Sequence, residues 1–462
     1  MDYGIATKVL SENGQGHVLQ FWDRLCPDER AALLQQIERL DFPSIARMKQ
    51  LMSSQTVVSE QSAFSPVEVL RPSADERARA GGVGEEALRK GGVGVILVAG
   101  GQGSRLGFDG PKGCFPIAPL SNGTLFEIHC RKVLALERRH GCAIPLYIMT
   151  SAENNDATVG FFRKNSNFGL SGERVKFFKQ GMWPALDSSG RIVLDRPNHI
   201  FMSPDGHGGT LSALLDNGML DDMKRRNIGS LFYFQVDNPM VEIADPVFIG
   251  LHLERKAEMS VKVCGKRDPE EGLGVVVMRE GRASMVEYTE LTREQKHARS
   301  AGGELKYNAG SVAIHVFSTA FLKKEASAQM PIHVAHKKVP YCDSTGLTIK
   351  PEKPNAYKFE KFIFDALPHA ERTVILDFMR SDEFSPVKNA VGDDSPETVR
   401  RDMIGKWARW LGECGFLVPM DKAGIPSCKI EIDPCFALDA AELRKKLPRG
   451  FAITGDVLLR QE

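Results

Sequence analysis

The stretch Val93-Gly-Val-Ile-Leu-Val-Ala-Gly-Gly-Gln-Gly-Ser-Arg-Leu-Gly-Phe-Asp-Gly-Pro-Lys-Gly113 decides the fold of this chain. It opens with the apolar run Val93 to Val98, which predicts a buried strand of a parallel sheet. Glycines follow at once and recur up to residue 113, with Arg105 and Lys112 among them. A backbone that bends this tightly can turn several N–H groups toward one ligand. The stretch therefore predicts a strand followed by a phosphate-binding loop.

Two common phosphate-binding motifs do not fit this loop. A P-loop requires Gly-x-x-x-x-Gly-Lys followed by Ser or Thr, but Gly103 to Gly107 is one residue short and is followed by Phe108. The dinucleotide fingerprint Gly-x-Gly-x-x-Gly fails because Leu106 stands where its last glycine should be. Kinase-type and nicotinamide-dependent activities therefore lose support. A longer loop with two cations suits a triphosphate, whose departing pyrophosphate gains charge.

Alternating strand and helix patterns continue beyond this loop. Thr124-Leu-Phe-Glu127 predicts the start of a helix, and Leu146 to Thr150 predicts the next strand. Further strands are expected at Arg174 to Phe178, His199 to Met202, Leu231 to Val236 and Met259 to Val263. The order predicts an α/β fold with a doubly wound, Rossmann-like sheet that is mixed but mainly parallel, and with ligands at the carboxyl ends of its strands.

The length of 462 residues predicts several domains, because a single core stops growing at about 250–300 residues. We expect a helical N-terminal domain at residues 1–88, a central nucleotide- and sugar-binding domain at 89–385 and a small strand-rich C-terminal domain at 386–462. The glycines at Gly81 to Gly84 and at Gly91 to Gly92 predict a short helix between them that starts only at Glu85 and ends at Lys90.

Composition excludes several classes of protein. The formal net charge of +1 lacks the basic excess that general nucleic-acid binding needs. No apolar run approaches the roughly 18 residues of a membrane span, and the first residues lack the apolar core of a signal peptide. The nine cysteines are scattered without a Cys-x-x-Cys pair, which indicates reduced thiols. We therefore expect a cytoplasmic protein with no nucleic-acid or membrane partner.

Two further segments are candidates for ligand binding. The cluster Ser203-Pro-Asp-Gly-His-Gly-Gly209 has more glycines than an ordinary strand-to-helix connection needs, and close approach of the backbone to a base or ribose would explain them. Asp237-Asn238 directly follows the apolar run Leu231 to Val236. A carboxylate at the end of a central strand can hold Mg²⁺, although Asp-Asn also suits a turn.

These motifs together resemble the eukaryotic-type UDP-N-acetylhexosamine pyrophosphorylases, which belong to the UDP-sugar pyrophosphorylase superfamily of nucleotidyltransferases. Besides the first loop and the segments around Pro204 and Asp237, the matching motifs are Phe177-Phe-Lys-Gln-Gly-Met182, Val286-Glu-Tyr288, Tyr307-Asn-Ala-Gly310 and Phe384-Ser-Pro-Val-Lys-Asn389. The match runs in order from about Gly92 to Asn389. The family's three-domain layout agrees with the expected division of the chain.

The resemblance implies roles in binding the nucleotide. Three cations would hold the triphosphate and the sugar or α phosphate during catalysis, namely Arg105, Lys112 and Lys388. The backbone contacts would come from Gly100, Gly101 and Gly103. Gln180 and Gly206 correspond to positions that recognise uracil, and Asp237 corresponds to the carboxylate that binds the nucleotide and the metal, Mg²⁺ or Mn²⁺.

Other positions concern the sugar. Glu287 and Asn308 correspond to sugar contacts, and Phe362 and Phe364 to positions near the N-acyl group. His207 stands in the nucleotide-binding loop where the N-acetylhexosamine enzymes usually carry Asn, whereas some broader UDP-sugar pyrophosphorylases carry His. The choice of sugar therefore stays open from the sequence.

The resemblance implies a uridylyltransferase that joins UTP and a sugar-1-phosphate, foremost N-acetylglucosamine-1-phosphate, into a UDP-sugar with release of pyrophosphate. A UDP-glucose or broad-specificity pyrophosphorylase is the nearest alternative. A non-catalytic nucleotide-sugar sensor is a more distant one, and a nicotinamide oxidoreductase is the weakest. We expect the chain to act as a monomer or a weak homo-oligomer.

Overall fold

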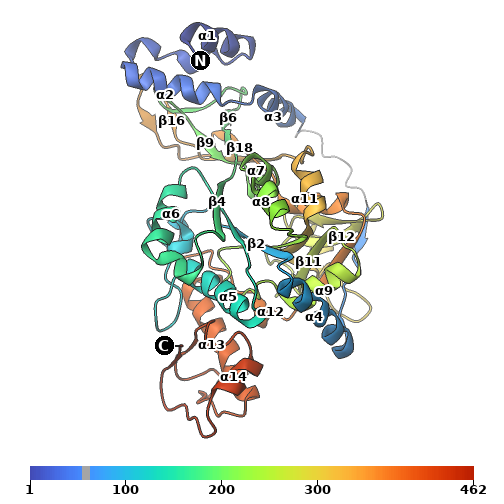
Figure 1. The fold of residues 1–462 in the computed structure, drawn as a ribbon. Helices are drawn as coiled ribbons and strands as arrows, with labels where there is room; N and C mark the ends of the chain where they lie inside the picture. The colour runs from blue at the N-terminus through green and yellow to red at the C-terminus, as the bar shows by residue number, and fades with distance from the viewer. Residues whose placement is uncertain (55–62, 462) are drawn as a thin grey trace. The chain divides into compact units, whose positions relative to one another are not determined.

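The structure is a computed structural model that describes residues 1–54 and 63–461 (Figure 1). It divides into two compact units. Unit 1 comprises Met1–Ser62, Gln180–Thr210 and Gln329–Asp365, and unit 2 comprises Ala63–Lys179, Leu211–Ala328 and Ala366–Glu462. Residues 55–62 of the expected N-terminal domain, and residue 462 of the expected C-terminal domain, lie outside the described residues. The division of the chain at residues 88 and 385 stays a prediction.

Unit 2 is built on one 10-stranded mixed sheet, which confirms the predicted fold class. Its strands are β1 (Phe64–Pro66), β2 (Val93–Val98), β3 (Leu146–Thr150), β4 (Val175–Lys179), β10 (Ser230–Gln235), β11 (Met259–Cys264), β12 (Val275–Arg279), β13 (Arg282–Val286), β14 (Gly310–Ser318) and β19 (Thr373–Asp377). The main path runs β1-β12-β14-β10-β2-β3-β4, with β13 beside β12, β11 beside β14, and β19 beside β11.

β10, β2, β3 and β4 form one parallel part of this sheet, and β11 and β19 form a separate parallel pair. Val98 pairs with Gln235 of β10 on one side and with Met149 of β3 on the other. The carboxyl ends of β2 and β10 therefore lie next to each other at one edge of the sheet. The loops that follow these two strands, at Gly100 and Asp237, must begin side by side.

Helices cover both faces of this sheet, as a doubly wound fold requires. The helices from residue 63 onward are α4 (Ala74–Arg89), α5 (Leu125–His140), α6 (Asn155–Lys164), α7 (Thr210–Asp216), α8 (Met219–Arg225), α9 (Pro246–Glu254), α10 (Arg293–His297), α11 (Thr319–Ala326), α12 (Arg380–Glu383), α13 (Pro396–Glu413) and α14 (Ala440–Lys446), and not all of them lie on the sheet. Ile148 of β3 shares one core with Phe126 of α5. The neighbouring Tyr147 donates its hydroxyl proton to Asp222 of α8 at 2.9 Å, so α8 covers the opposite face.

Helix α4 corrects the prediction that a helix starts only at Glu85. It runs from Ala74 through all the glycines that were expected to exclude it, after Ser73 caps its first turn. The reason is packing against α9, because a Cβ on Gly84 would lie 1.9 Å from the carbonyl oxygen of Pro246. The mirror contact occurs at Gly250 of α9, where a Cβ would lie 1.8 Å from the carbonyl oxygen of Ala80. Glycine here allows two helices to approach closely, which a single sequence does not distinguish from a break.

Unit 1 has its own core of helices and short strands. Its elements are α1 (Tyr3–Glu12), α2 (Pro27–Glu38), α3 (Phe42–Ser54), β5 (Met182–Pro184), β6 (Leu186–Asp187), β7 (Leu194–Arg196), β8 (His199–Ile200), β9 (Met202–Pro204), β15 (His333–Lys337), β16 (Tyr341–Cys342), β17 (Thr348–Ile349) and β18 (Ala356–Glu360). Leu33 and Ile37 of α2 are buried in one cluster with Ile200 and Phe359. The prediction that His199 to Met202 belongs to the large sheet is wrong, because β8 and β9 form short antiparallel pairs with β7 and β5.

The last part of the chain combines two helices with two short strands. β20 (Ile430–Ile432) pairs in parallel with β21 (Val457–Leu459). Leu411 of α13 and Leu443 of α14 are buried in one cluster with Ile430 and Ile453. The apolar residues that indicated strands in this tail thus fill a small core shared by strands and helices.

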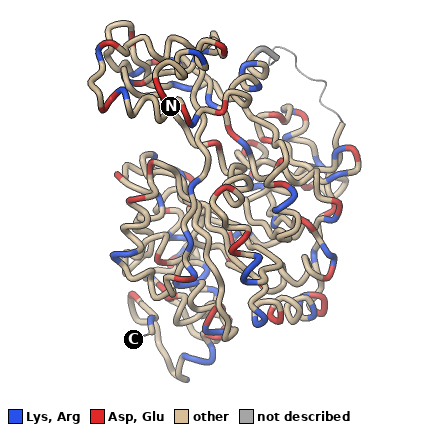
Figure 2. The backbone as a smooth tube through the Cα atoms, turned by 45° about the horizontal axis from the view of Figure 1, so that its top comes forward, with Lys and Arg blue, Asp and Glu red and all other residues tan. Residues whose placement is uncertain are grey.

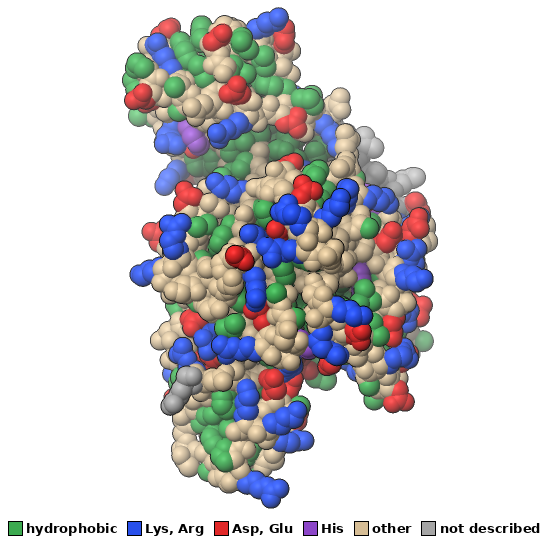
Figure 3. Space-filling model, in the orientation of Figure 1, with side chains coloured by type: hydrophobic (Ala, Val, Ile, Leu, Met, Phe, Trp, Pro, Cys, Tyr) green, Lys and Arg blue, Asp and Glu red, His purple; other side chains and the backbone are tan. Residues whose placement is uncertain are grey.

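Charges of both signs are spread along the described parts of the backbone, and basic and acidic side chains both occur across the face drawn in space-filling form (Figures 2 and 3). All nine cysteines are free thiols, which agrees with the prediction from their spacing. Within the described residues, no helix is both long and apolar enough to cross a membrane. The cytoplasmic location stays a prediction.

Candidate functional site

The glycine loop after β2 is a folded turn held by its own backbone. Gly103 donates its N–H to the carbonyl oxygen of Gly110 at 2.9 Å, and Lys112 donates to that of Gly101 at 3.1 Å. The side-chain amide of Asn154 donates to the carbonyl oxygens of Ala99 and Gly101, at 2.8 and 3.2 Å. Gly101 is exposed, and a Cβ there would meet nothing within 4 Å. The loop is therefore shaped in advance, with open space beside Gly101.

Lys112 and Asp237 meet where the two adjacent parallel strands end. The ammonium nitrogen of Lys112 lies 3.8 Å from Oδ2 of Asp237, and their side chains are 18% and 13% exposed. A third segment joins them, since Lys112 donates to the carbonyl oxygen of Val387 at 3.3 Å and Val387 donates its N–H to that of Asp237 at 2.8 Å. The structure thus brings a cation, a carboxylate and the backbone next to Lys388 together at one edge of the sheet.

Arg105 and Lys388 are the other two predicted cations, and both belong to unit 2. Arg105 lies in the short turn Ser104–Leu106 with its side chain exposed. Among the described residues it has no hydrogen bond or ion pair. The ammonium nitrogen of Lys388 lies 3.9 Å from Oδ2 of Asp394 and 5.8 Å from the ring centroid of Phe384. Neither the Arg105 guanidinium nor the Lys388 ammonium makes a close hydrogen bond to a described residue, so each is available to an anionic ligand.

Glu287 and Asn308 lie at the ends of neighbouring strands in unit 2. Val275 of β12 pairs with Val286 on one side and with Gly310 on the other, so Glu287 and Asn308 flank the same end of β12. Both side chains are partly exposed. The Asn308 side-chain oxygen accepts the backbone N–H of Lys266 at 2.7 Å, which fixes its orientation.

The second glycine cluster, in unit 1, packs against a neighbouring backbone segment. Gly206 has φ +85°, and a Cβ there would lie 2.4 Å from the carbonyl oxygen of Lys361. Gly208 donates its N–H to the same oxygen at 2.9 Å, and Lys361 donates to the carbonyl of Asp205 at 2.7 Å. Close packing within the protein therefore accounts for these glycines, a reason that the sequence interpretation did not consider.

This packing brings three of the predicted residues together in unit 1. The ring of His207 stacks on Phe362 with centroids 5.3 Å apart, and Phe364 lies 5.7 Å away. The backbone N–H of Ile363 donates to Nδ1 of His207 at 3.2 Å, so the neutral ring carries its proton on Nε2. Burial, and then the charge of His333, lowers the pKa of His207 to about 4. His207 is therefore a neutral imidazole with a donor left at Nε2. Gln180, also in unit 1, is buried at the end of β4.

Sequence reasoning missed Glu383 and Lys262, the buried residues that support Asp237 through Asn238. The Asn238 side chain donates to the carbonyl oxygen of Glu383 at 2.6 Å and accepts the N–H of Ser385 at 3.1 Å. The Glu383 carboxylate in turn pairs with Lys262 in the middle of β11. A lysine inside an otherwise apolar strand pattern was the signal that could have revealed this network.

Comparisons with known proteins agree with this architecture. Residues 45–393 match the protein family described as UTP–glucose-1-phosphate uridylyltransferase. The human protein UDP-N-acetylhexosamine pyrophosphorylase-like protein 1 is 37% identical over 432 residues, which cover 88% of this chain and 85% of the human one. UDP-N-acetylglucosamine pyrophosphorylase of Saccharomyces cerevisiae is 34% identical over 436 residues, which cover 89% of this chain and 91% of the yeast one.

A solved structure extends the likeness to three dimensions. The crystal structure of the uridine diphosphate N-acetylglucosamine pyrophosphorylase from Trypanosoma brucei, in complex with an inhibitor, superimposes with a TM-score of 0.83 at 29% identity. The match covers 99% of this chain and 98% of the trypanosome chain. These findings confirm the resemblance that the sequence motifs indicated, and the chain belongs to the UTP–glucose-1-phosphate uridylyltransferase family.

Proposed function

We propose that this protein is a uridylyltransferase that forms a UDP-sugar and pyrophosphate from UTP and a sugar-1-phosphate, foremost N-acetylglucosamine-1-phosphate. The observation that carries the proposal is the meeting of Lys112 and Asp237, 3.8 Å apart, where β2 and β10 end beside the glycine loop. Ligands of doubly wound sheets bind at this edge. The names of the human and yeast relatives favour an N-acetylhexosamine substrate.

The reaction needs positioning and charge neutralisation more than proton transfer. A phosphate oxygen of the sugar-1-phosphate is already an anion, so it can attack the α-phosphorus of UTP in line without a general base or a covalent intermediate. The bond to the departing pyrophosphate breaks as the new P–O bond forms. Lys112 and the exposed Arg105 neutralise the triphosphate, and Lys388 neutralises the sugar phosphate or the α-phosphate.

A divalent metal, Mg²⁺ or Mn²⁺, fits Asp237. Mg²⁺ in nucleotide sites is commonly held by one or two carboxylates together with substrate phosphates, and Asp237 offers one partly exposed carboxylate beside the loop. A group of three carboxylates, Glu242, Asp245 and Glu383, fits less well. The Lys262 ammonium already occupies it, at 2.8 Å from Asp245 and 2.5 Å from Glu383. The metal, when bound at Asp237, would neutralise phosphate oxygens.

The remaining predicted residues would select the substrate. We assign sugar contacts to Glu287, Asn308, Phe362 and Phe364, and contacts to the nucleotide to the backbone of Gly100, Gly101 and Gly103 and to Gln180, Gly206 and His207. The Nε2–H of His207 offers a donor where an Asn amide would offer one as well. A change from Asn to His at this position is therefore compatible with the same kind of contact.

The experiment that tests the proposal measures pyrophosphate release with UTP and Mg²⁺ across a panel of sugar phosphates. We expect turnover with N-acetylglucosamine-1-phosphate to exceed turnover with glucose-1-phosphate. A preference for glucose-1-phosphate would instead establish the UDP-glucose alternative. If the protein binds a UDP-sugar but releases no pyrophosphate from UTP with any sugar phosphate of the panel, it is a sensor.

A further inference from the structure

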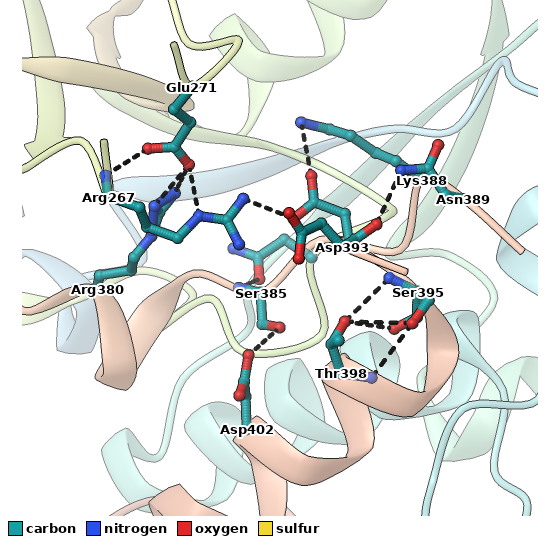
Figure 4. Close-up of polar contacts among 12 residues, drawn as sticks. Arg267, Glu271, Arg380, Ser385, Lys388, Asn389, Asp393, Ser395, Thr398 and Asp402 are labelled. Atoms are coloured by element: carbon teal, nitrogen blue, oxygen red, sulfur yellow. Dashed lines mark hydrogen bonds and ion pairs between the residues drawn. The ribbon is translucent and has the colours of Figure 1, made fainter. Parts of the chain in front are cut away.

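Lys388 and Asp394 form a loose ion pair at the base of a short loop in unit 2 (Figure 4). Their charged atoms are 3.9 Å apart, which is too long for a hydrogen bond, and the Lys388 side chain is 39% exposed. The backbone is much more firmly tied, because the carbonyl oxygen of Asp394 accepts the N–H of Lys388 at 2.7 Å and that of Asn389 at 3.1 Å. The loop therefore fixes where the carboxylate stands while leaving the ammonium free to move.

Asp394 is also held from its other side by a chain of charged residues. Its Oδ1 lies 3.4 Å from the guanidinium of Arg267. Arg267 in turn pairs with Glu271 at 3.0 Å, and Glu271 pairs with Arg380 at 2.5 Å. The Glu271 side chain is only 6% exposed, so burial and its pair with Arg380 hold it in place. Figure 4 shows Arg267 and Lys388, from two separate connecting segments of the chain, reaching toward the segment that carries Asp393.

We propose that Asp394 is a counter-ion that competes with a substrate phosphate for the ammonium group of Lys388. The inference rests on the proposed function, in which Lys388 neutralises a phosphate. Asp394 keeps its Arg267 partner when Lys388 leaves, so losing the lysine does not strand an unpaired carboxylate. Lys388, by contrast, exchanges a loose carboxylate partner for a phosphate of higher charge. Asp394 is thus a positioning residue. It holds the Lys388 ammonium group in the free protein and releases it when the substrate phosphate binds.

The backbone at Asp394 offers a clean substitution. Asp394 has φ +54°, a conformation that Asn and Gly adopt at little cost. Asp394→Asn therefore removes the charge and keeps the loop, and Asp394→Gly serves as a second variant with the same tolerance. Asp393 is the matched control, because it is the adjacent carboxylate in the same loop and its side chain forms no ion pair with Lys388 among the described residues.

The test measures the dissociation constant of UTP with Mg²⁺ by calorimetry on the full chain, together with KM and kcat for pyrophosphate release. Removing a competing charge at a partly exposed pair is expected to lower the dissociation constant of UTP or the KM of the sugar-1-phosphate, whichever phosphate Lys388 serves, about two- to fivefold in Asp394→Asn and Asp394→Gly. The gain should shrink at high salt, because exposed charges are then screened. It should vanish when Asp394→Asn is made in a Lys388→Ala background. Loss of a merely structural contact would weaken binding instead.

Two results would overturn the inference while leaving the proposed function intact. One is that Asp394→Asn leaves unchanged, or raises, both the dissociation constant of UTP and the KM of the sugar-1-phosphate. The other is an equal gain in substrate affinity in Asp393→Asn. That result would indicate a general change of the electrostatic field and no competition for Lys388. Failure of the wild-type chain to bind UTP would overturn both the proposed function and this inference, so the two failures are distinguishable.

Discussion

The ammonium nitrogen of Lys262 lies 2.5 Å from Oε1 of Glu383, and the two side chains are only 1% and 6% exposed. Burial alone would lower the pKa of Lys262, but the carboxylates of Asp245 and Glu383 outweigh it and raise the pKa above its ordinary value. Through the backbone of Glu383, which accepts the Asn238 amide, this ion pair supports the turn that carries Asp237. A buried charge pair in β11 therefore underlies the candidate site.

Lys262→Met is expected to lower the free energy of unfolding by about 3–5 kcal/mol, because it leaves the buried Glu383 carboxylate and the partly buried Asp245 carboxylate without their cation. Burial raises the pKa of Glu383, and loss of Lys262 will raise it further. A raised carboxyl pKa favours the folded state below the unfolded-state value and loses that contribution as pH rises through the folded-state value. The variant should thus be less destabilised at pH 5 than at pH 8 in urea titrations. Equal destabilisation at both pH values would contradict the assignment.

Gly84→Ala is expected to lower the free energy of unfolding by about 1–3 kcal/mol, because its Cβ would meet the Pro246 carbonyl oxygen at 1.9 Å. Gly82→Ala is the matched control on the same helix, since a Cβ there meets nothing within 4 Å. That control should stabilise the chain by about 0.5–1 kcal/mol, as Ala replaces Gly inside a helix. Urea titration of both variants tests the packing of α4 on α9, and similar effects in the two would refute it.

His207 is expected to stay neutral well below pH 6, because burial and then His333 lower its pKa to about 4 from an ordinary value of 6.5. The folded chain then binds fewer protons than the unfolded chain, so this contribution to stability is present above pH 6.5 and is lost as pH falls through about 4. Wild type should lose more stability between pH 7 and pH 4.5 than His207→Phe. Nitrogen NMR should show the proton on Nε2, and a titration midpoint near 6.5 would count against this account.

The part of the fold that follows from local pattern could be predicted from the sequence. Val93 to Val98 forms β2 as expected, and Lys112 and Asp237 meet because each follows one of two adjacent parallel strands. The short pairings of unit 1 could not be predicted, since β18 (Ala356–Glu360) joins β6 (Leu186–Asp187) across a long stretch of chain. Periodicity records which face of a strand is buried but says nothing about a distant partner.

The supporting residues of the candidate site were equally hidden. The residues on either side of Lys262 in its strand are apolar. Its partner Glu383 lies far along the chain in a polar segment. Asp394 was not a candidate, because it lies in a polar segment and only the folded backbone brings it to Lys388. A side chain that acts through a second side chain stands at no fixed separation from it in the sequence. A single sequence therefore does not reveal such a pair.

Chelation of divalent metal by EDTA is expected to abolish pyrophosphate release, and added Mg²⁺ should restore it. Asp237→Asn should raise the Mg²⁺ concentration for half-maximal rate by about tenfold or more, because a neutral amide is a poorer ligand for a hard cation. Glu242→Gln, in the carboxylate group already occupied by Lys262, is the control and should leave the Mg²⁺ requirement unchanged. A larger change in Glu242→Gln than in Asp237→Asn would indicate that the metal binds at the group of Glu242, Asp245 and Glu383 instead.

The measurement that tests the central claim most directly compares pyrophosphate release from UTP and N-acetylglucosamine-1-phosphate by wild type and Lys112→Ala. Lys112 lies 3.8 Å from Asp237 at the end of the glycine loop, and its charge is assigned to the departing pyrophosphate. Removing one preorganised charge from a developing anion costs about 10²–10³-fold in rate. The account predicts turnover by wild type and a loss of at least about 100-fold in a folded Lys112→Ala. Absence of release by wild type, or near-normal turnover by the variant, would contradict it.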